Sequence, residues 1–151
     1  MTDFRAARPA DAEAIAAFQA AMARETESLE LDLPTVRRGV AAVFADPSKG
    51  RYFVADEGAG PVASLLITYE WSDWRDGVVW WIQSVFVTPE ARGRKVYSGL
   101  YAFVQALAWK DERVRGLRLY VEKKNLAAQK VYAALGMSGE HYTVFERMKT
   151  F

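Results

Sequence analysis

The sequence contains no cysteine among its 151 residues, and it contains a single histidine. The absence of cysteine excludes disulfides and thiolate metal sites, and one imidazole argues against a histidine-based metal centre. We therefore expect no bound metal. A chain without cysteine is compatible with a reducing compartment, so we expect a cytoplasmic protein.

Long apolar runs and an excess of one charge are also missing. No stretch approaches the roughly 20 apolar residues that span a bilayer. The first residues, MTDFRAARPADAEAI, have no apolar run behind a basic start, so we expect neither a membrane span nor a signal peptide. The net charge is +1, whereas a broad nucleic-acid surface needs a clear basic excess. Any anion site must therefore be local.

The chain does contain enough apolar material for a core. Hydrophobic residues make up 51% of the sequence and charged residues 26%, which is typical of a soluble globular domain. The length is within the usual size of one domain, so we expect residues 1–151 to form a single domain.

The spacing of apolar residues predicts alternating strands and helices. The predicted elements are a short edge strand at FRAARP, a helix at about 10–24, a helix from Pro34 to DPSKGR, a hairpin over 52–71, a strand over 78–87, a helix over about 96–112, a strand at LRLYVE (117–122), a helix from Asn125 to Gly136 and a last strand at HYTVFERM (141–148). The strand over 78–87, the helix after it and the next strand form a crossover, which makes that strand pair parallel. The hairpins are antiparallel, so the fold class is a mixed α/β sheet with helices on both faces.

The segment TPEARGRKVYSGLY, residues 88–101, has the features of a local anion site. It leads from a strand into a helix, and the first turn of a helix presents unpaired N–H groups and a partial positive charge. Gly93 lets the backbone approach a ligand closely. Arg92, Arg94 and Lys95 add positive charge at a helix end where it opposes the helix dipole, and such conflicts tend to mark function. The alternative is a solvated basic turn.

Two motifs make this chain resemble the GNAT superfamily of acyl-CoA N-acyltransferases. The first is PEARGRKVYSGL after the strand WIQSVFV, and the second is NLAAQKVYAALGM. The likeness spans nearly the whole chain, including the order of elements. The family loop is written Q/R-x-x-G-x-G/A, and this sequence departs from it. Gly93 matches the first glycine, but Glu90 stands at the Q/R position and Lys95 at the second small position, while Tyr97 replaces a residue that is often small.

The resemblance implies a mostly antiparallel sheet, a splayed parallel strand pair and a site for acetyl-CoA. The central strand would be separated from its neighbour by a bulge and would bind the pantetheine arm. The implied site residues are Val85, Phe86 and Val87 for that arm, the backbone of Arg92, Gly93, Arg94, Lys95, Val96 and Tyr97 together with Ser98 for the pyrophosphate, Asn125 for the pantetheine side and Tyr132 as the acid that protonates the departing thiolate. Lys95 could contact a phosphate, whereas Tyr97 should point away and pack against the strand or the acyl pocket.

The second motif is chemically consistent with these roles. Asn125, Ala128 and Tyr132 lie on one face of a helix by their spacing. A phenol can donate a proton to a thiolate leaving group. The structural alternatives are a helix N-cap for Asn125, which does not exclude ligand binding, and a core position for Tyr132.

Three questions remain open at the level of sequence. Glu70, Asp73 or His141 could be the base that deprotonates the acceptor amine, or water alone could suffice; Gln83 could only form hydrogen bonds. The acidic loop with Glu25, Glu27, Glu30 and Asp32 could attract a cationic amine or be simply solvated. The tryptophans at 71, 74, 80 and 81 could line a pocket or pack in the core and hairpin.

The resulting hypothesis is an N-acetyltransferase. It would transfer an acetyl group from acetyl-CoA to a primary amine of a small molecule or peptide, by direct attack in a ternary complex. The alternative is a non-catalytic acyl-CoA-binding or regulatory domain on the same fold. We expect no nucleic-acid or membrane partner, and by analogy with the family we expect that a homodimer can form.

Overall fold

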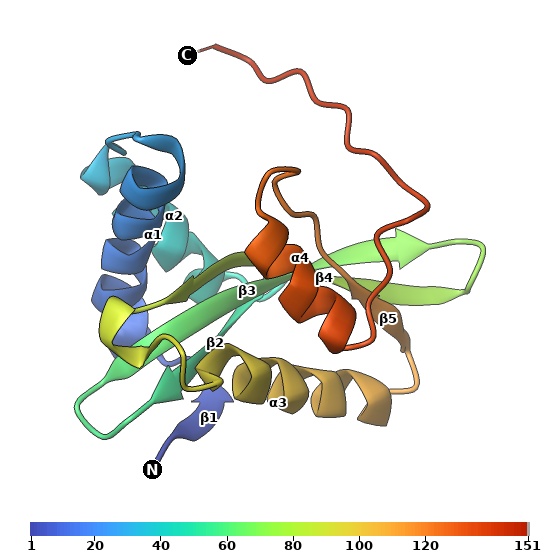
Figure 1. The fold of residues 1–151 in the computed structure, drawn as a ribbon, viewed down its shortest axis with the longest axis horizontal. Coiled ribbons are helices and arrows are strands. Elements are labelled where there is room, and N and C mark those ends of the chain that lie inside the picture. The colour runs from blue at the N-terminus through green and yellow to red at the C-terminus, as the bar shows by residue number, and fades with distance from the viewer. Residues whose placement is uncertain (151) are drawn as a thin grey trace. The chain divides into compact units, whose positions relative to one another are not determined.

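A computed structural model describes residues 1–150, and the chain divides into two compact units (Figure 1). The first unit covers Met1–Arg118, and the second begins at Leu119. The first unit contains the sheet and most of the helices. Its elements are β1 (Asp3–Ala6), a 3-10 turn (Pro9–Asp11), α1 (Ala12–Glu27), α2 (Leu33–Ala45), β2 (Arg51–Asp56), β3 (Pro61–Ser72), β4 (Gly77–Val87), a 3-10 turn (Pro89–Ala91), α3 (Val96–Lys110) and β5 (Val114–Arg118).

The five strands form one sheet in the order β1-β2-β3-β4-β5. The first three pairings are antiparallel, and only β4 and β5 run parallel. Both hairpins expected from the sequence are present, with turns between β2 and β3 and between β3 and β4. The mixed, mostly antiparallel sheet with one parallel pair is therefore confirmed.

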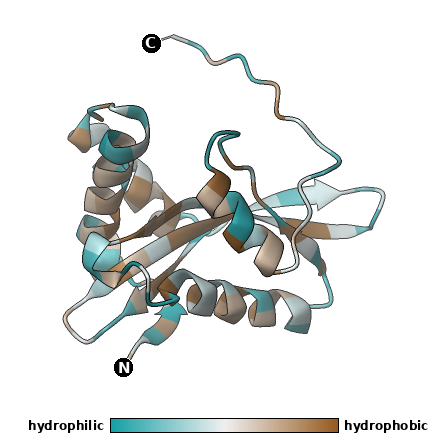
Figure 2. Cartoon of the chain, viewed as in Figure 1, coloured by the Kyte–Doolittle hydropathy of each residue, from teal (hydrophilic) through white to brown (hydrophobic). Residues whose placement is uncertain are grey.

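Helices cover both faces of this sheet. Consecutive residues on a strand point to opposite faces, and Phe53 and Val54 of β2 show which helices lie on each. Val54 belongs to a buried cluster with Ile15 of α1 and Val40 of α2, whereas the Phe53 ring lies 6.1 Å from that of Phe103 of α3. The central strands are largely hydrophobic in Figure 2, as expected for a sheet buried on two sides.

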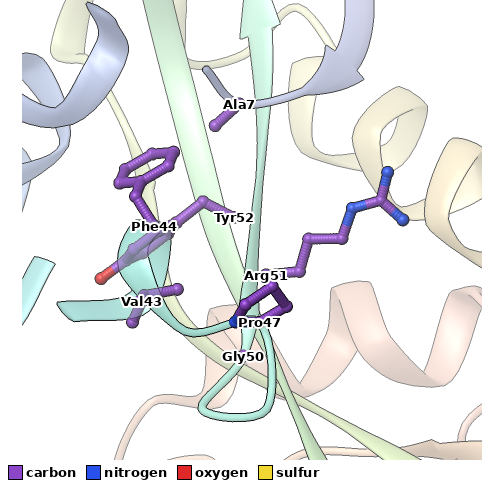
Figure 3. A pocket seen from close by; sticks show the side chains of 7 residues that line it. All are labelled: Ala7, Val43, Phe44, Pro47, Gly50, Arg51 and Tyr52. Carbon is purple, nitrogen blue, oxygen red and sulfur yellow. The ribbon is translucent and has the colours of Figure 1, made fainter. Parts of the chain in front are cut away.

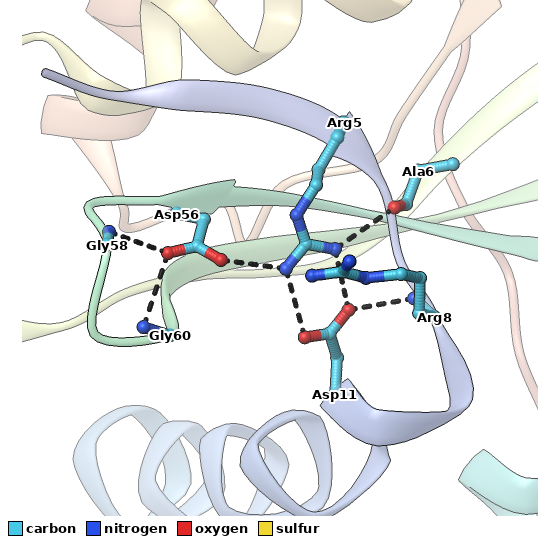
Figure 4. A network of polar contacts seen from close by, with 7 residues as sticks. All are labelled: Arg5, Ala6, Arg8, Asp11, Asp56, Gly58 and Gly60. Atoms are coloured by element: carbon cyan, nitrogen blue, oxygen red, sulfur yellow. Dashed lines mark hydrogen bonds and ion pairs between the residues drawn. The ribbon is translucent and has the colours of Figure 1, made fainter.

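A network of charged side chains ties β1 to the β2–β3 turn (Figure 4). The Arg5 guanidinium donates to both Asp11 oxygens, at 2.7 and 3.1 Å, and to Asp56 at 2.8 Å. Asp56 also accepts from the backbone N–H groups of Gly58 and Gly60. The Arg5 guanidinium lowers the pKa of both carboxyl groups, so the network holds these carboxylates ionised and fixes the turn that follows β2.

The second unit contains one helix, α4 (Leu126–Ala134). The sequence-based expectation for the strands around it is wrong in two places. The strand predicted at 117–122 is β5 at Val114–Arg118, because its ladder to β4 ends where Trp81 faces Arg118. The strand predicted at 141–148 is not formed in the described chain. Without a neighbouring edge, alternating residues do not make a strand, and the side chains of Tyr142 and Phe145 are exposed. No helix within residues 1–150 is both long and apolar enough to cross a membrane.

Candidate functional site

The end of β4 is bent by a bulge. Ser64 of β3 faces Phe86 and Leu66 faces Gln83, so one residue of β3 opposes two residues of β4, Ser84 and Val85. Ser84 has a φ of 53°, a left-handed conformation that is uncommon outside glycine. The bulge re-aims the backbone of residues 85–87, where the sequence predicts the pantetheine site.

The parallel pair opens at the same end of the sheet. The β4–β5 ladder runs from Val78 to Trp81 on the β4 side, while β4 itself continues to Val87. The edge of β4 beyond Trp81 is therefore outside the ladder with β5, which is the splay expected from the sequence. A backbone edge of this kind can hydrogen-bond an extended ligand.

The loop before α3 takes a left-handed conformation at two positions. Gly93 has a φ of 77° and Lys95 a φ of 59°. A Cβ at Gly93 would meet no atom within 4 Å, so backbone conformation, and not crowding, favours glycine there. These are the two small positions of the predicted motif. Lys95 adopts the left-handed conformation at a cost of about 1 kcal/mol relative to a right-handed residue.

The first turn of α3 presents backbone donors at this loop. Gly99 donates to the carbonyl of Lys95, and the N–H groups of a first helical turn point outward at the helix end, where a ligand can accept from them. Lys95 is the N-cap, and its side chain makes no capping hydrogen bond within the described residues. The helix end is therefore suited to bind an anion, with the Lys95 ammonium beside it.

The Arg92 side chain points away from this helix end. Its Nε donates to the carbonyl of Val87 at 2.9 Å and its Nη2 donates to Glu25 of α1 at 2.7 Å. The guanidinium also lies 5.5 Å from the centre of the Phe86 ring. Arg92 therefore links α1 to the end of β4, which is a structural role that the sequence did not indicate.

The Arg94 side chain is also paired. Its guanidinium makes a two-pronged contact with Glu57 in the β2–β3 turn, with N–O distances of 2.6 and 3.0 Å. Each partner shifts the pKa of the other, lowering that of Glu57 and raising that of Arg94. Nothing in the sequence connects DEGAG, which contains Glu57, to the loop, because the contact spans 37 residues.

The Tyr97 ring packs against α3 itself. Its centre lies 6.3 Å from that of Tyr101, one turn further along the helix, and Tyr101 is buried. The side chain is therefore directed along the helix toward its buried side. Ser98 is half-buried beside it.

Asn125 caps α4 in the second unit. Its Oδ1 accepts from the N–H of Ala128 at 3.0 Å, so the predicted N-cap is confirmed. Gln129 adds a bond from its Nε2 to the carbonyl of Lys123 at 2.9 Å. Because the cap uses Oδ1, the Asn125 amide nitrogen remains the donor with which this side chain can address a ligand.

Tyr132 lies near the other end of α4, two turns from Asn125 on the same face. Met137 donates to the carbonyl of Tyr132 and Gly136 to that of Ala133, and Gly136 has a φ of 88°. This is a Schellman ending, so the predicted C-cap glycine is confirmed. Partial burial raises the pKa of the Tyr132 phenol above its usual value, so the phenol is protonated at neutral pH.

Glu70, the first candidate base, does not lie at the end of β4. Glu70 is paired with Arg118 and accepts from the Trp81 indole N–H at 3.2 Å. It faces Val79, and six residues separate Val79 from Val85, about 20 Å of strand. Gln83 bonds to the Thr68 hydroxyl. The two other candidates, Asp73 and His141, are exposed.

The acidic loop and the tryptophans have largely structural or surface positions. Glu25 pairs with Arg92, Glu30 pairs with Arg24 at 2.9 Å and Asp32 caps α2. These contacts favour structural roles over the recruitment of a cationic amine. The Trp71 and Trp74 side chains are exposed around the β3–β4 turn, whereas those of residues 80 and 81 are half-buried.

A separate cavity of about 160 Å³ lies beside α2 and the start of β2 (Figure 3). Its lining is mainly apolar, and the stacked rings of Phe44 and Tyr52 are 5.7 Å apart. Arg51 lies at the opposite end of β2 from the turn that carries Glu57. The cavity is therefore not part of the site at the end of β4. No group of three or more histidine, aspartate or glutamate residues suitable for a metal occurs within residues 1–150.

Comparison with known proteins identifies the family. The model of the acetyltransferase (GNAT) family matches residues 14–137. The chain belongs to the GNAT acetyltransferase family. A search of curated proteins finds no match, but many solved structures are similar. A possible acetyltransferase from Clostridium difficile 630 is 39% identical, with a TM-score of 0.92 over 100% of this chain and 99% of that chain.

Two further GNAT-like structures share the fold at lower identity. AAC(6')-Iy in complex with the bisubstrate analogue CoA-S-monomethyl-acetylneamine is 18% identical, with a TM-score of 0.77 over 99% of both chains. The ribosomal-protein-alanine N-acetyltransferase from Brucella melitensis biovar Abortus 2308 is 13% identical, with a TM-score of 0.79 over 99% of this chain and 100% of that chain. At these identities the likeness establishes the GNAT fold alone.

Proposed function

We propose that this GNAT protein transfers an acetyl group from acetyl-CoA to a primary amine. The observation that carries the proposal is the combination, at one end of the sheet, of a bulged and splayed β4 with a left-handed loop at the start of α3. A strand edge suits the amide-bearing arm of coenzyme A, and the N–H groups of a first helical turn suit a pyrophosphate.

Acetyl-CoA supplies an activated acetyl group as a thioester. The backbone of Val85, Phe86 and Val87 orients this thioester, and the first turn of α3 with Lys95 binds the phosphates. The nitrogen of the neutral acceptor amine forms a bond to the acetyl carbon, the carbon–sulfur bond breaks, and the amine loses its proton to solvent. Tyr132 gives its proton to the departing sulfur, and Asn125 donates its amide N–H to the pantetheine side.

None of the three candidates, Glu70, Asp73 and His141, is assigned as a dedicated base in this proposal. Glu70 is held in an ion pair at a distance along the strand, and Asp73 and His141 are exposed. Proton removal through water is consistent with these positions. A steady-state rate that rises with pH as the free amine is deprotonated, with no inflection from a side chain, is the expected behaviour.

The acceptor is best found with a screen for CoA thiol release. The arms are polyamines, free amino acids, aminoglycosides and peptide N-termini, the last two suggested by the neamine bisubstrate complex and the ribosomal-protein-alanine enzyme. Release above the rate of acetyl-CoA hydrolysis with any amine supports transfer. Absence of release in all arms, together with calorimetric binding of acetyl-CoA and desulpho-CoA, would favour a non-catalytic acyl-CoA-binding domain.

The non-catalytic alternative rests on the substitution of lysine for a small residue at position 95. The left-handed backbone at Lys95 weakens this support, because the loop keeps the conformation that a small residue would allow. Enzymatic transfer is therefore the function we favour.

A further inference from the structure

The three basic side chains at the start of α3 are held in different ways. Arg92 has three contacts, with the Val87 carbonyl, Glu25 and the Phe86 ring. Among the described residues Arg94 has one ion-pair partner, the Glu57 carboxylate. Lys95 forms no ion pair with any described residue. Of the two arginines, only Arg94 can therefore leave its position by giving up a single partner.

Glu57 is presented to the loop from a fixed support. It directly follows Asp56, whose carboxylate accepts from the N–H groups of Gly58 and Gly60 at 2.8 and 3.2 Å and from Arg5 (Figure 4). The turn is thereby shaped around Asp56. The Glu57 carboxylate offers Arg94 two oxygens in the fork geometry that a phosphate would also offer.

We propose that Glu57 is an internal substitute for an anionic group of the ligand. On binding, Arg94 exchanges the Glu57 carboxylate for a phosphate group of coenzyme A. This inference rests on the proposed function, because it needs a phosphate ligand at the loop. The Arg94 side chain is 51% exposed, and exposed ion pairs are weak, so the exchange requires little free energy.

The exchange weakens the binding of any ligand that engages Arg94. Before binding, Glu25 and Glu57 neutralise two of the three positive side chains at the loop. A ligand must compete with Glu57 for Arg94, and the free energy of breaking the pair is subtracted from its binding free energy. The Kd for coenzyme A is therefore raised by the factor that the pair contributes.

The test is calorimetric titration of the full chain with CoA at fixed ionic strength. In Glu57→Gln the competitor is removed, and the Kd for CoA is expected to fall about threefold. Arg94→Gln is expected to raise the Kd, and in the double variant the gain from Glu57→Gln should disappear.

Glu25→Gln is the matched control. It removes the same charge from the partner of the neighbouring arginine, so it reproduces any general change in potential without freeing Arg94. An equal fall of the Kd for CoA in Glu57→Gln and Glu25→Gln would overturn the exchange. A Kd that is unchanged or raised in Glu57→Gln, while the melting temperature is unchanged, would overturn it as well. Titration with dephospho-CoA, which lacks the 3′-phosphate, shows which phosphate Arg94 binds. If Glu57→Gln still lowers the Kd for dephospho-CoA, Arg94 binds the pyrophosphate. If the Kd for dephospho-CoA does not change, Arg94 binds the 3′-phosphate.

The same titrations separate the two levels of the proposal. If the wild-type chain does not bind CoA, both the proposed function and the exchange fail. If the wild-type chain binds CoA and Glu57→Gln gives no gain, only the exchange fails and Arg94 remains a structural link to the β2–β3 turn.

Discussion

Arg92 and Glu25 join the loop before α3 to the last turn of α1, with Nη2 of Arg92 2.7 Å from Oε2 of Glu25. The same guanidinium bonds to the carbonyl of Val87 at the end of β4. One side chain thus connects a helix, a strand end and the candidate anion loop. This position differs from that of Arg94, whose carboxylate partner, Glu57, lies in the β2–β3 turn.

The two arginines should therefore respond differently to substitution. Arg92→Gln removes an ion pair, a bond to a backbone carbonyl and a contact with an aromatic ring, so we expect the free energy of unfolding to fall by about 1 kcal/mol. Arg94→Gln should leave the unfolding midpoint nearly unchanged. Urea unfolding followed by fluorescence measures both. An equal loss in the two variants would contradict the structural role of Arg92.

Lys95 can be tested for its charge and its backbone conformation separately. Asparagine tolerates the left-handed region better than most residues, so Lys95→Asn removes the charge and should leave stability unchanged while the Kd for CoA rises about tenfold. Valine is poorly suited to that region, and Lys95→Val should lower the free energy of unfolding by about 1–2 kcal/mol. Calorimetry and urea unfolding distinguish the two effects. Unchanged CoA affinity in Lys95→Asn would remove the ammonium from the site.

Much of the fold could be predicted because its signals are local. Apolar spacing located the helices and hairpins, Pro89 marked the end of β4, and Asn125 and Gly136 marked the ends of α4. The error at β5 has a physical cause. The alternation in LRLYVE continues past Arg118, but the ladder to β4 ends at the pair of Trp81 and Arg118. An alternating pattern indicates which residues are able to form a strand, whereas the neighbouring strand to which they hydrogen-bond determines where the strand ends.

For the candidate site, the sequence could predict the backbone conformation of the loop but not the contacts of its side chains. The left-handed loop follows from Gly93 and the motif around it, but the partners of its side chains do not. Arg94 meets Glu57 across 37 residues and Arg92 meets Glu25 across 67. The bulge at Ser84 likewise has no clear local signal, since IQSVF reads as regular strand. Contacts of long sequence separation depend on the assembled sheet, so a single sequence cannot specify them.

The Arg5 network predicts acid sensitivity. The Arg5 guanidinium lowers the pKa of Asp11 and Asp56. A carboxyl group whose pKa is lower in the folded state stabilises the fold above its unfolded pKa, near 4, and this contribution is lost as the pH falls through the folded value. We therefore expect the melting temperature to decline below about pH 4.

Arg5→Gln tests the source of that decline. It leaves two partly buried carboxylates without their cation, so we expect the free energy of unfolding at pH 7 to fall by about 2 kcal/mol. The decline in melting temperature between pH 4 and pH 2 should also become shallower in the variant, as measured by scanning calorimetry. An identical acid profile in wild type and Arg5→Gln would show that other groups cause the decline.

Tyr132→Phe isolates the acid of the proposed reaction. Removal of the phenol leaves the thiolate without its proton donor, so kcat should fall about 100-fold, while the Kd for CoA should stay within twofold because the ring remains. Burial raises the pKa of Tyr132, so wild-type activity should lose this proton donor only above about pH 10. Stopped assays of thiol release and calorimetry give these values. Tyr142→Phe, at an exposed tyrosine of the same unit, is the matched control and should keep full turnover. Full turnover in Tyr132→Phe would show that solvent, and not Tyr132, protonates the thiolate.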